Sequence, residues 1–264
     1  GYVVAKSEAD NSSGIGGGSS RTNPNSSTAA AKNGGNATIV IGGKGKKPIV
    51  RTGSIGGGST TKGQIGSAII TIEEGDIQAQ FVMAQSTGNS FTMEGGLIRN
   101  SSTSDDTYYC IKENGGAVYM EQGTFTMKDG EIRACSADKG VSSKGGAVYI
   151  KGDENTSFTM KGGKISECRA NADGGAVYLE GGSVTIAGGK IDGNVAYNGN
   201  GGAISILGGS FLMDGTSALI TQNAAFNSRS GVNGNGGGIY ISPASYTSNA
   251  TVDVTLKKGS ITGN

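Results

Sequence analysis

The chain has 264 residues, of which 50 are glycine and only 3 are proline, and it contains neither histidine nor tryptophan. This much glycine without proline excludes collagen, and a largely helical protein is excluded because interior glycine destabilises a helix by about 1 kcal/mol. Lys+Arg 22 against Asp+Glu 21 gives a net charge of +1 with the two signs interspersed, so no nucleic-acid partner is expected.

The absence of histidine limits the chemistry that the chain can perform. It removes the Ser–His and Cys–His nucleophile pairs and the zinc sites that use histidine, so any catalysis must use carboxylates, lysine, arginine or tyrosine. We expect no enzymatic activity, no catalytic residue, no metal ligand and no cofactor. No apolar run approaches the roughly 20 residues of a membrane span, so none is predicted.

Two parts of the chain differ in regularity. Residues 1–36 are rich in glycine and serine and form an N-terminal segment or an irregular first rung. Residues 37–264 carry a repeat of three blocks. A Gly-Gly-Ala-Val-Tyr block recurs at steps of 30, 29, 27 and 35 residues. Three copies are identical, Gly115–Tyr119, Gly145–Tyr149 and Gly174–Tyr178, and two are variants, Gly201–Ser205 (GGAIS) and Gly236–Tyr240 (GGGIY).

Two further blocks complete each repeat. A block of the Phe-Thr-Met type starts at Phe91, Phe125, Phe158, Val184, Phe211 and Val254. A third block carries Ile98, Ile132, Ile165, Ile191, Ile220 and Ile261. Apolar residues alternate within each block, as in a half-buried strand, and glycine-rich corners separate the blocks.

Three short strands per repeat predict an all-β fold, a three-sided parallel β-helix of about seven or eight rungs. Stacked rungs lie about 4.8 Å apart, so like residues form ladders. A β-propeller is the main rival, but its four strands per blade do not fit three blocks. The chirality of parallel crossovers favours a right-handed coil.

The repeat resembles a known group of proteins. Gly-Gly-Ala with a following Val or Ile, together with Ile-x-x-Asn, is similar to the repeats of chlamydial polymorphic outer-membrane proteins. It also resembles the repeats of surface β-helix proteins of treponemes and gut anaerobes. The resemblance covers roughly residues 65–264. It implies a right-handed β-helix, export to the bacterial cell surface, and an adhesin or passenger role.

The third block ends in a position that is asparagine or cysteine. Asn194, Asn223 and Asn264 are predicted to turn inward and form a structural asparagine ladder. Cys135 and Cys168 occupy the same position in two rungs, where a disulfide and two buried thiols are equal alternatives. Cys110, in a variable loop one rung earlier, is also within reach of Cys135.

Two outward rows are candidate contact faces. Tyr119, Tyr149, Tyr178 and Tyr240 are expected to form an outward tyrosine row, flanked by alanines, that either shields one face or contacts glycans or another protein. Thr92, Thr126, Thr159, Thr185 and Thr255 form an outward hydroxyl row that resembles ice-binding faces. Charged neighbours such as Lys128 and Lys161 favour ordinary β-propensity instead.

We therefore expect an extracellular, non-catalytic structural or adhesin segment that displays loops and ladder faces. Its expected partners are other copies of itself, end to end or side by side, or a host glycan or protein. A polysaccharide-active enzyme is the main alternative, because many β-helices are lyases or hydrolases with clustered carboxylates. The adjacent acids Glu73-Glu74 and Asp105-Asp106 are interpreted as loop charges. An ice- or crystal-binding face is a minor alternative.

Overall fold

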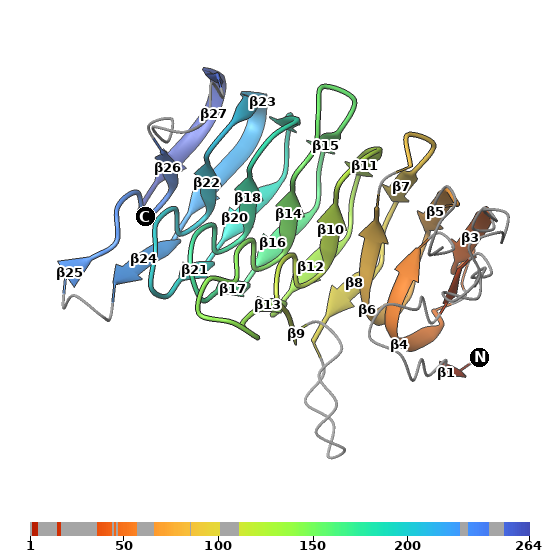
Figure 1. Ribbon diagram of the computed structural model, residues 1–264. Coiled ribbons are helices and arrows are strands. Elements are labelled where there is room, and N and C mark those ends of the chain that lie inside the picture. Colours follow the sequence, from red (N-terminus) through yellow and green to blue (C-terminus); the bar gives the residue numbers. More distant parts are fainter. Residues whose placement is uncertain are drawn as a thin grey trace, which may run out of the picture.

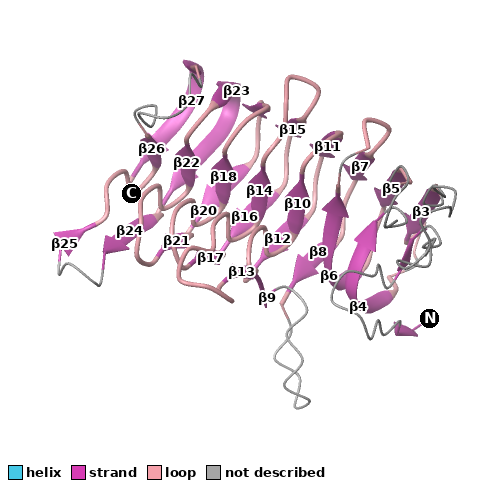
Figure 2. Cartoon of the chain, viewed as in Figure 1, coloured by secondary structure: helices cyan, strands magenta, loops and turns pink. Residues whose placement is uncertain are grey.

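The computed structural model is an all-β, parallel solenoid of about six turns (Figure 1, Figure 2). It describes residues 2–4, 15–16, 36–43, 45, 47–56, 66–84, 86–100, 111–227, 232–242 and 251–264. Within these residues there is no helix. The chain winds along the axis in sequence order, so β3 (Ala37–Ile41) lies near one end and β27 (Val252–Thr262) at the other (Figure 1).

The first face contains the Phe-Thr-Met strands. Its members pair in parallel, and the register matches Phe91 with Phe125 and Phe125 with Phe158. The strands are β3, β5 (Ala68–Ile72), β7 (Ser90–Met93), β11 (Thr124–Met127), β15 (Ser157–Met160), β19 (Ser183–Ile186) and the first parts of β23 (Gly209–Thr221) and β27.

The second face contains the isoleucine strands. Ile98, Ile132, Ile165 and Ile191 are paired in register from rung to rung. The strands are β1 (Tyr2–Val4), the first parts of β4 (Ile49–Gly56) and β6 (Asp76–Met83), β8 (Leu97–Arg99), β12 (Glu131–Arg133), β16 (Lys164–Ser166), β20 (Lys190–Asp192) and the last parts of β23 and β27.

The third face, which was also predicted, contains the Val-Tyr strands. It includes β2 (Ile15–Gly16), the last parts of β4 and β6, β10 (Val118–Met120), β14 (Val148–Ile150), β18 (Val177–Leu179), β22 (Ile204–Ile206) and β26 (Ile239–Ile241). The repeat blocks therefore correspond to three faces of a parallel β-helix, which confirms the predicted fold class. The solenoid has about six turns rather than the seven or eight expected.

A fourth, shorter column of strands is absent from the prediction. It consists of β9 (Ile111–Lys112), β13 (Ser136–Ala137), β17 (Arg169–Ala170), β21 (Val195–Ala196), β24 (Ala224–Asn227) and β25 (Val232–Asn233). All are parallel except β25, which pairs antiparallel with β24. They lie between the isoleucine strands and the Val-Tyr strands of each rung (Figure 1).

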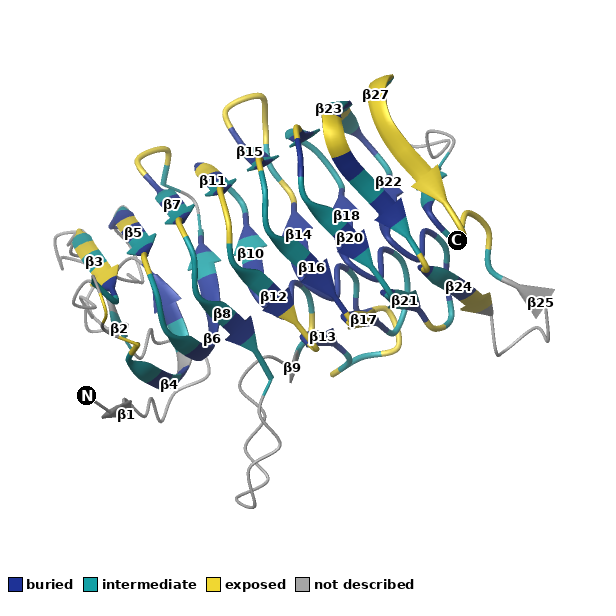
Figure 3. Ribbon diagram, turned by 180° about the vertical axis from the view of Figure 1, so that it is seen from behind, coloured by how far each residue is buried: buried dark blue, intermediate teal, exposed yellow. Residues whose placement is uncertain are grey.

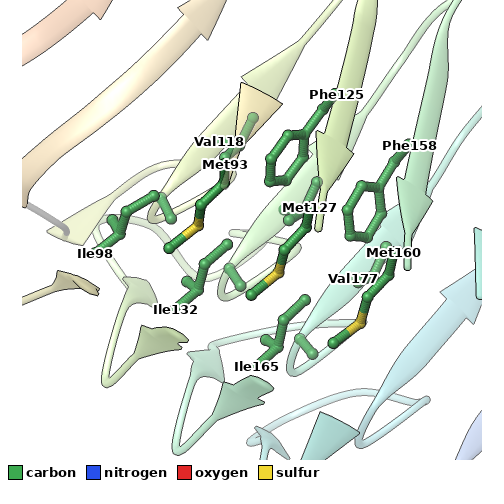
Figure 4. Close-up of a cluster of buried hydrophobic side chains, with 14 of the residues drawn as sticks. Met93, Ile98, Val118, Phe125, Met127, Ile132, Phe158, Met160, Ile165 and Val177 are labelled. Atoms are coloured by element: carbon green, nitrogen blue, oxygen red, sulfur yellow. The ribbon is translucent and has the colours of Figure 1, made fainter. Parts of the chain in front are cut away.

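Ladders of identical or similar apolar side chains fill the interior (Figure 4). The rings of Phe91 and Phe125 stack with centroids 4.5 Å apart, and those of Phe125 and Phe158 with centroids 4.7 Å apart. The methionines and isoleucines of the same rungs are also fully buried. The buried core follows the axis of the solenoid, whereas β27 at its end is largely exposed (Figure 3).

The Gly-Gly pair before each Val-Tyr strand has a steric explanation. Gly145 has a φ of 66°, in the left-handed region that side chains other than glycine resist. A Cβ on Gly146 would lie 2.1 Å from the carbonyl oxygen of Gly175 in the next rung. The first glycine therefore supplies the turn, and the second permits close packing of adjacent rungs.

The orientation of the alanine after this Gly-Gly pair differs from the prediction. Ala147 was expected to point outward with Tyr149, but it is fully buried in the core cluster. The N–H groups of Ala147 and Val148 both donate to the carbonyl of Ala176, so the strand is bulged there and the simple alternation is interrupted.

Candidate functional site

The asparagines at the end of the isoleucine strands form a continuous hydrogen-bonded ladder. The Asn194 amide nitrogen donates to Asn223 Oδ1 at 2.9 Å, and that of Asn223 donates to Asn264 Oδ1 at 2.8 Å. Each amide also donates to the isoleucine carbonyl of the preceding rung, Ile165 O at 3.1 Å for Asn194 and Ile191 O at 3.1 Å for Asn223. The buried amides therefore satisfy backbone groups at a corner that has no strand pairing of its own.

Cys135 and Cys168 occupy the same ladder position in the two preceding rungs. The Cys168 thiol lies 3.8 Å from Ile132 O and 3.3 Å from Ser166 O, the two carbonyls that correspond to the asparagine acceptors. Cys135 repeats this arrangement, with its sulfur 3.9 Å from Ile98 O. Both side chains are buried, and no disulfide joins Cys135 to Cys168. Cys110 lies outside the described residues.

The residue before each ladder position has a left-handed backbone. Ala134, Glu167 and Gln222 have φ of 52°, 56° and 57°, and glycine occupies the same position as Gly193 and Gly263. This conformation turns the chain so that the next side chain points inward. Left-handed φ in residues other than glycine or asparagine is uncommon, so the corner holds strain in three rungs.

A second polar ladder precedes the Gly-Gly pairs and was not predicted. Asn200 donates from its backbone N–H to Asp173 Oδ1 at 2.7 Å, and Asn235 donates to Asn200 Oδ1 at 2.9 Å. The signal was present in the sequence as an Asn or Asp directly before Gly-Gly. A repeat that is taken to start at the first glycine leaves this position out.

The tyrosine row stacks, but its centre is covered. The rings of Tyr119 and Tyr149 are stacked with centroids 5.4 Å apart, and Tyr149 and Tyr178 with centroids 5.5 Å apart. Tyr149 is only 6% exposed and Tyr178 only 2%. These two rings therefore fit the alternative of a stacked row that shields one face, and they leave little surface for a contact strip. Ser205 interrupts the row before Tyr240.

Charged residues from neighbouring segments hold the tyrosine hydroxyls. Tyr119 donates to Glu121 at 2.8 Å, Tyr149 donates to Glu180, and Lys144 donates to the Tyr178 hydroxyl at 2.9 Å. Burial, reinforced by the hydrogen bonds to carboxylates, raises the pKa of Tyr119 and Tyr149 above the usual tyrosine value. Burial also raises the pKa of Tyr178, although Lys144 opposes the shift.

The outward hydroxyl row is in register, with charges alongside it. Thr92, Thr126, Thr159 and Thr185 are paired consecutively, and Leu212 then precedes Thr255. The neighbouring Lys128 and Glu94 form an ion pair of 2.8 Å at the edge of this row.

A shallow groove lies at the turns between the Val-Tyr strands and the Phe-Thr-Met strands. Its volume is about 480 Å³. Its lining carboxylates are Asp153, Glu154, Glu180 and Asp253. Two of them have internal partners: Asp153 accepts from the backbone N–H of Asn155 at 2.9 Å, and Glu180 accepts from Tyr149. Sequence reasoning did not bring these acids together because they come from three different rungs.

The described residues contain no cluster of three or more side chains suited to hold a metal ion. Asp105-Asp106 lies outside the described residues, whereas Glu73-Glu74 follows β5 at a turn. In the described part of the chain, no helix has the length and apolarity that crossing a bilayer requires.

No protein-family model, curated protein or solved structure matches the chain.

Proposed function

We propose that this chain is a stiff, non-catalytic segment of an exported bacterial surface protein, which holds loops and side faces in fixed positions. The observation that supports the proposal is the continuity of the ladders: core positions remain in register over consecutive rungs, and the Asn194–Asn223–Asn264 ladder continues that order into a corner. Such a structure resists bending because every rung is bonded to both neighbours.

The resemblance to chlamydial, treponemal and gut-anaerobe surface repeats supplies the cellular setting of this proposal. In that setting the segment acts as an adhesin or passenger whose partners are host glycans or proteins, or other copies of the chain. Its turns project from the solenoid between strands, where substitutions leave the core untouched (Figure 1).

The proposal is tested by determining whether the segment is exposed on the surface of the cell that produces it. Antibodies raised against residues 111–227 are expected to label intact cells, and brief protease treatment of intact cells should remove the label. Labelling that appears only after permeabilisation would refute export to the surface.

The acidic groove supports a second candidate, a polysaccharide-active enzyme. Such an enzyme needs carboxylates gathered at one site, and Asp153, Glu154, Glu180 and Asp253 line the same groove. Incubation with neutral and acidic polysaccharides, with and without Ca²⁺, tests this candidate. Cleavage that is lost in both Glu180→Gln and Asp253→Asn would establish it, whereas equal cleavage in those variants would point to a contaminant.

A further inference from the structure

The outer face of the short column differs from the other faces of the solenoid. Ala137, Ala170, Ala196 and Ala225 are buried on its inner side. The residues on either side of these alanines lie on the outer side in two rows. The rows are Ser136, Arg169, Val195 and Ala224, of which Ser136 is buried, and Asp138, Asn171, Tyr197 and Phe226. This outer side is polar over β13 and β17 and apolar over β21 and β24.

The apolar half is an exposed pair of aromatic rings. Tyr197 is 46% exposed and Phe226 is 45% exposed, whereas the other aromatic pairs of neighbouring rungs stack in parallel and are largely covered. The centroids of Tyr197 and Phe226 are 6.3 Å apart and their planes are inclined by 58°. The two rings therefore form an inclined pair that is open to solvent. We call Tyr197, Phe226 and the adjoining Arg169, Asp138 and Asn171 the aromatic face.

Hydrogen bonds and an ion pair hold the polar half in place beside the two rings. The Arg169 guanidinium lies 5.4 Å from the Tyr197 ring centroid and forms an ion pair with Asp138. Asn171 donates to Gly140 O at 3.0 Å and accepts from Asn198 at 2.7 Å. These contacts fix a guanidinium, a carboxylate and an amide next to the rings before any ligand arrives, which lowers the entropic cost of binding.

We propose that the aromatic face binds an uncharged pyranose ring of a glycan. A sugar ring has an apolar C–H face that fits an aromatic ring and peripheral hydroxyls that fit amide, carboxylate and guanidinium groups. Tyrosine offers both features, because its ring is apolar and its hydroxyl is polar. This proposal names a ligand class for the surface function proposed above. It rests on that function in one respect, that the glycan lies outside the cell.

Area and charge favour this ligand over the alternatives. A stable protein partner or second copy buries about 800 Å² on each side, with a large apolar centre. Among the described residues of the aromatic face, Tyr197 and Phe226 are the exposed large apolar side chains, and rungs about 4.8 Å apart give them room for one or two sugar rings. The charges of Arg169 and Asp138 neutralise each other, so the face does not call for an acidic sugar.

Saturation-transfer NMR with the 264-residue chain tests the proposal, with lactose and cellotetraose as neutral probes and digalacturonate as the acidic comparison. We expect transfer to C–H protons of at least one neutral probe. Tyr197→Ala and Phe226→Ala should each weaken binding roughly tenfold, as expected when one stacking ring is lost. Tyr197→Phe should retain most binding, because the ring remains.

Tyr240→Ser is the matched control, since serine already occupies the adjacent position Ser205 in that row. It removes a tyrosine from a different face and should leave binding unchanged, and thermal melting verifies that every variant is folded. The proposal is overturned if neither neutral probe receives saturation, if the acidic probe binds in their place, or if the Ala variants bind as well as the parent. It is also overturned if sedimentation shows self-association that the Ala variants abolish, since the face would then belong to a second copy.

Failure of the glycan proposal can be distinguished from failure of the proposed surface function. Labelled intact cells without saccharide binding would remove only the glycan site. Saccharide binding by a protein that antibodies detect only inside the cell would remove only the surface function.

Discussion

The corner before each ladder position imposes a backbone conformation that only some residues adopt readily. Gln222 has a φ of 57°, and Gly193 and Gly263 fill the same position in neighbouring rungs. We expect Gln222→Gly to increase the free energy of unfolding by about 0.5–1 kcal/mol, because the strain of the left-handed region exceeds the entropy that glycine adds to the unfolded chain. Urea denaturation measures the change.

Two further variants distinguish strain from other effects. Gly193→Ala should be destabilising even though a Cβ there meets nothing within 4 Å, so the loss would come from the backbone alone. Thr221→Gly, one residue before Gln222 and within β23, should destabilise the protein because glycine weakens a strand. A Gln222→Gly variant less stable than the parent would contradict this account.

Cys168 acts as an incomplete member of the asparagine ladder. Asn194 Oδ1 accepts the backbone N–H of Cys168 at 2.9 Å, whereas Asn223 Oδ1 accepts both the backbone and the side-chain nitrogen of Asn194. We expect Cys168→Asn to add the missing amide hydrogen bond and to replace two weak thiol contacts. The gain in the free energy of unfolding should be about 1 kcal/mol.

The control for this substitution is Cys168→Ala, which removes the thiol without adding a donor. It should destabilise the protein, since Ile132 O and Ser166 O lose their contacts. If Asn and Ala at this position had the same stability, the ladder would not be a source of stability there.

At the scale of the structural elements, the tyrosine row is expected to make the free energy of unfolding fall as the pH rises into the alkaline range. The raised pKa of Tyr119 and Tyr149 in the folded chain means that both keep their protons above pH of about 10, where unfolded tyrosines lose theirs. Their contribution is fully present below about pH 10 and is lost progressively as the pH rises further, because the unfolded chain then binds fewer protons.

Urea unfolding measured from neutral pH to about pH 11.5 tests this dependence. The combined variant Tyr119→Phe/Tyr149→Phe should lose stability less steeply above about pH 10 than the parent does. The single variant Tyr240→Phe, outside the stacked rings, is the comparison for removing a tyrosine elsewhere. Equal slopes in the parent and the combined variant would show that the stacked rings are not responsible.

The strands that repeat a side-chain pattern were predictable, and the rest of each rung was not. Phe125-Thr126-Met127 and Ile132 recur with fixed spacing because their side chains stack directly on equivalents in the next rung. The short column has only two paired residues in β13 and β17, and its sole repeated feature is a buried alanine, which gives a weak signal.

The candidate sites were harder to predict for a physical reason. Alternation indicates that Tyr149 points away from the core, but burial depends on Glu180 and on neighbouring rings, which reach it from other rungs. In contrast, Tyr197 and Phe226 belong to blocks without a recurring aromatic residue, and only the register of β21 with β24 brings them together.

At the scale of the whole molecule, the strand at the end of the solenoid has one open edge. Within the described residues β27 pairs with β23 alone, and Leu256 is 58% and Ile261 40% exposed. These side chains continue the buried methionine and isoleucine ladders, so a strand placed against β27 would find complementary apolar rows. Full burial of such a side chain contributes roughly 1.5–3 kcal/mol, and the open backbone groups would gain partners.

We therefore expect the 264-residue chain to associate through β27 with another copy as its concentration rises, which sedimentation equilibrium measures. The combined variant Leu256→Lys/Ile261→Lys should shift the chain toward monomer, because lysine on an edge opposes strand pairing. Val141→Lys is the matched control: Val141 is 61% exposed but lies in a turn between β13 and β14, away from β27, so its substitution should leave association unchanged. A parent chain that stays monomeric at every concentration, or a control that dissociates as readily as the edge variant, would show that β27 does not mediate assembly.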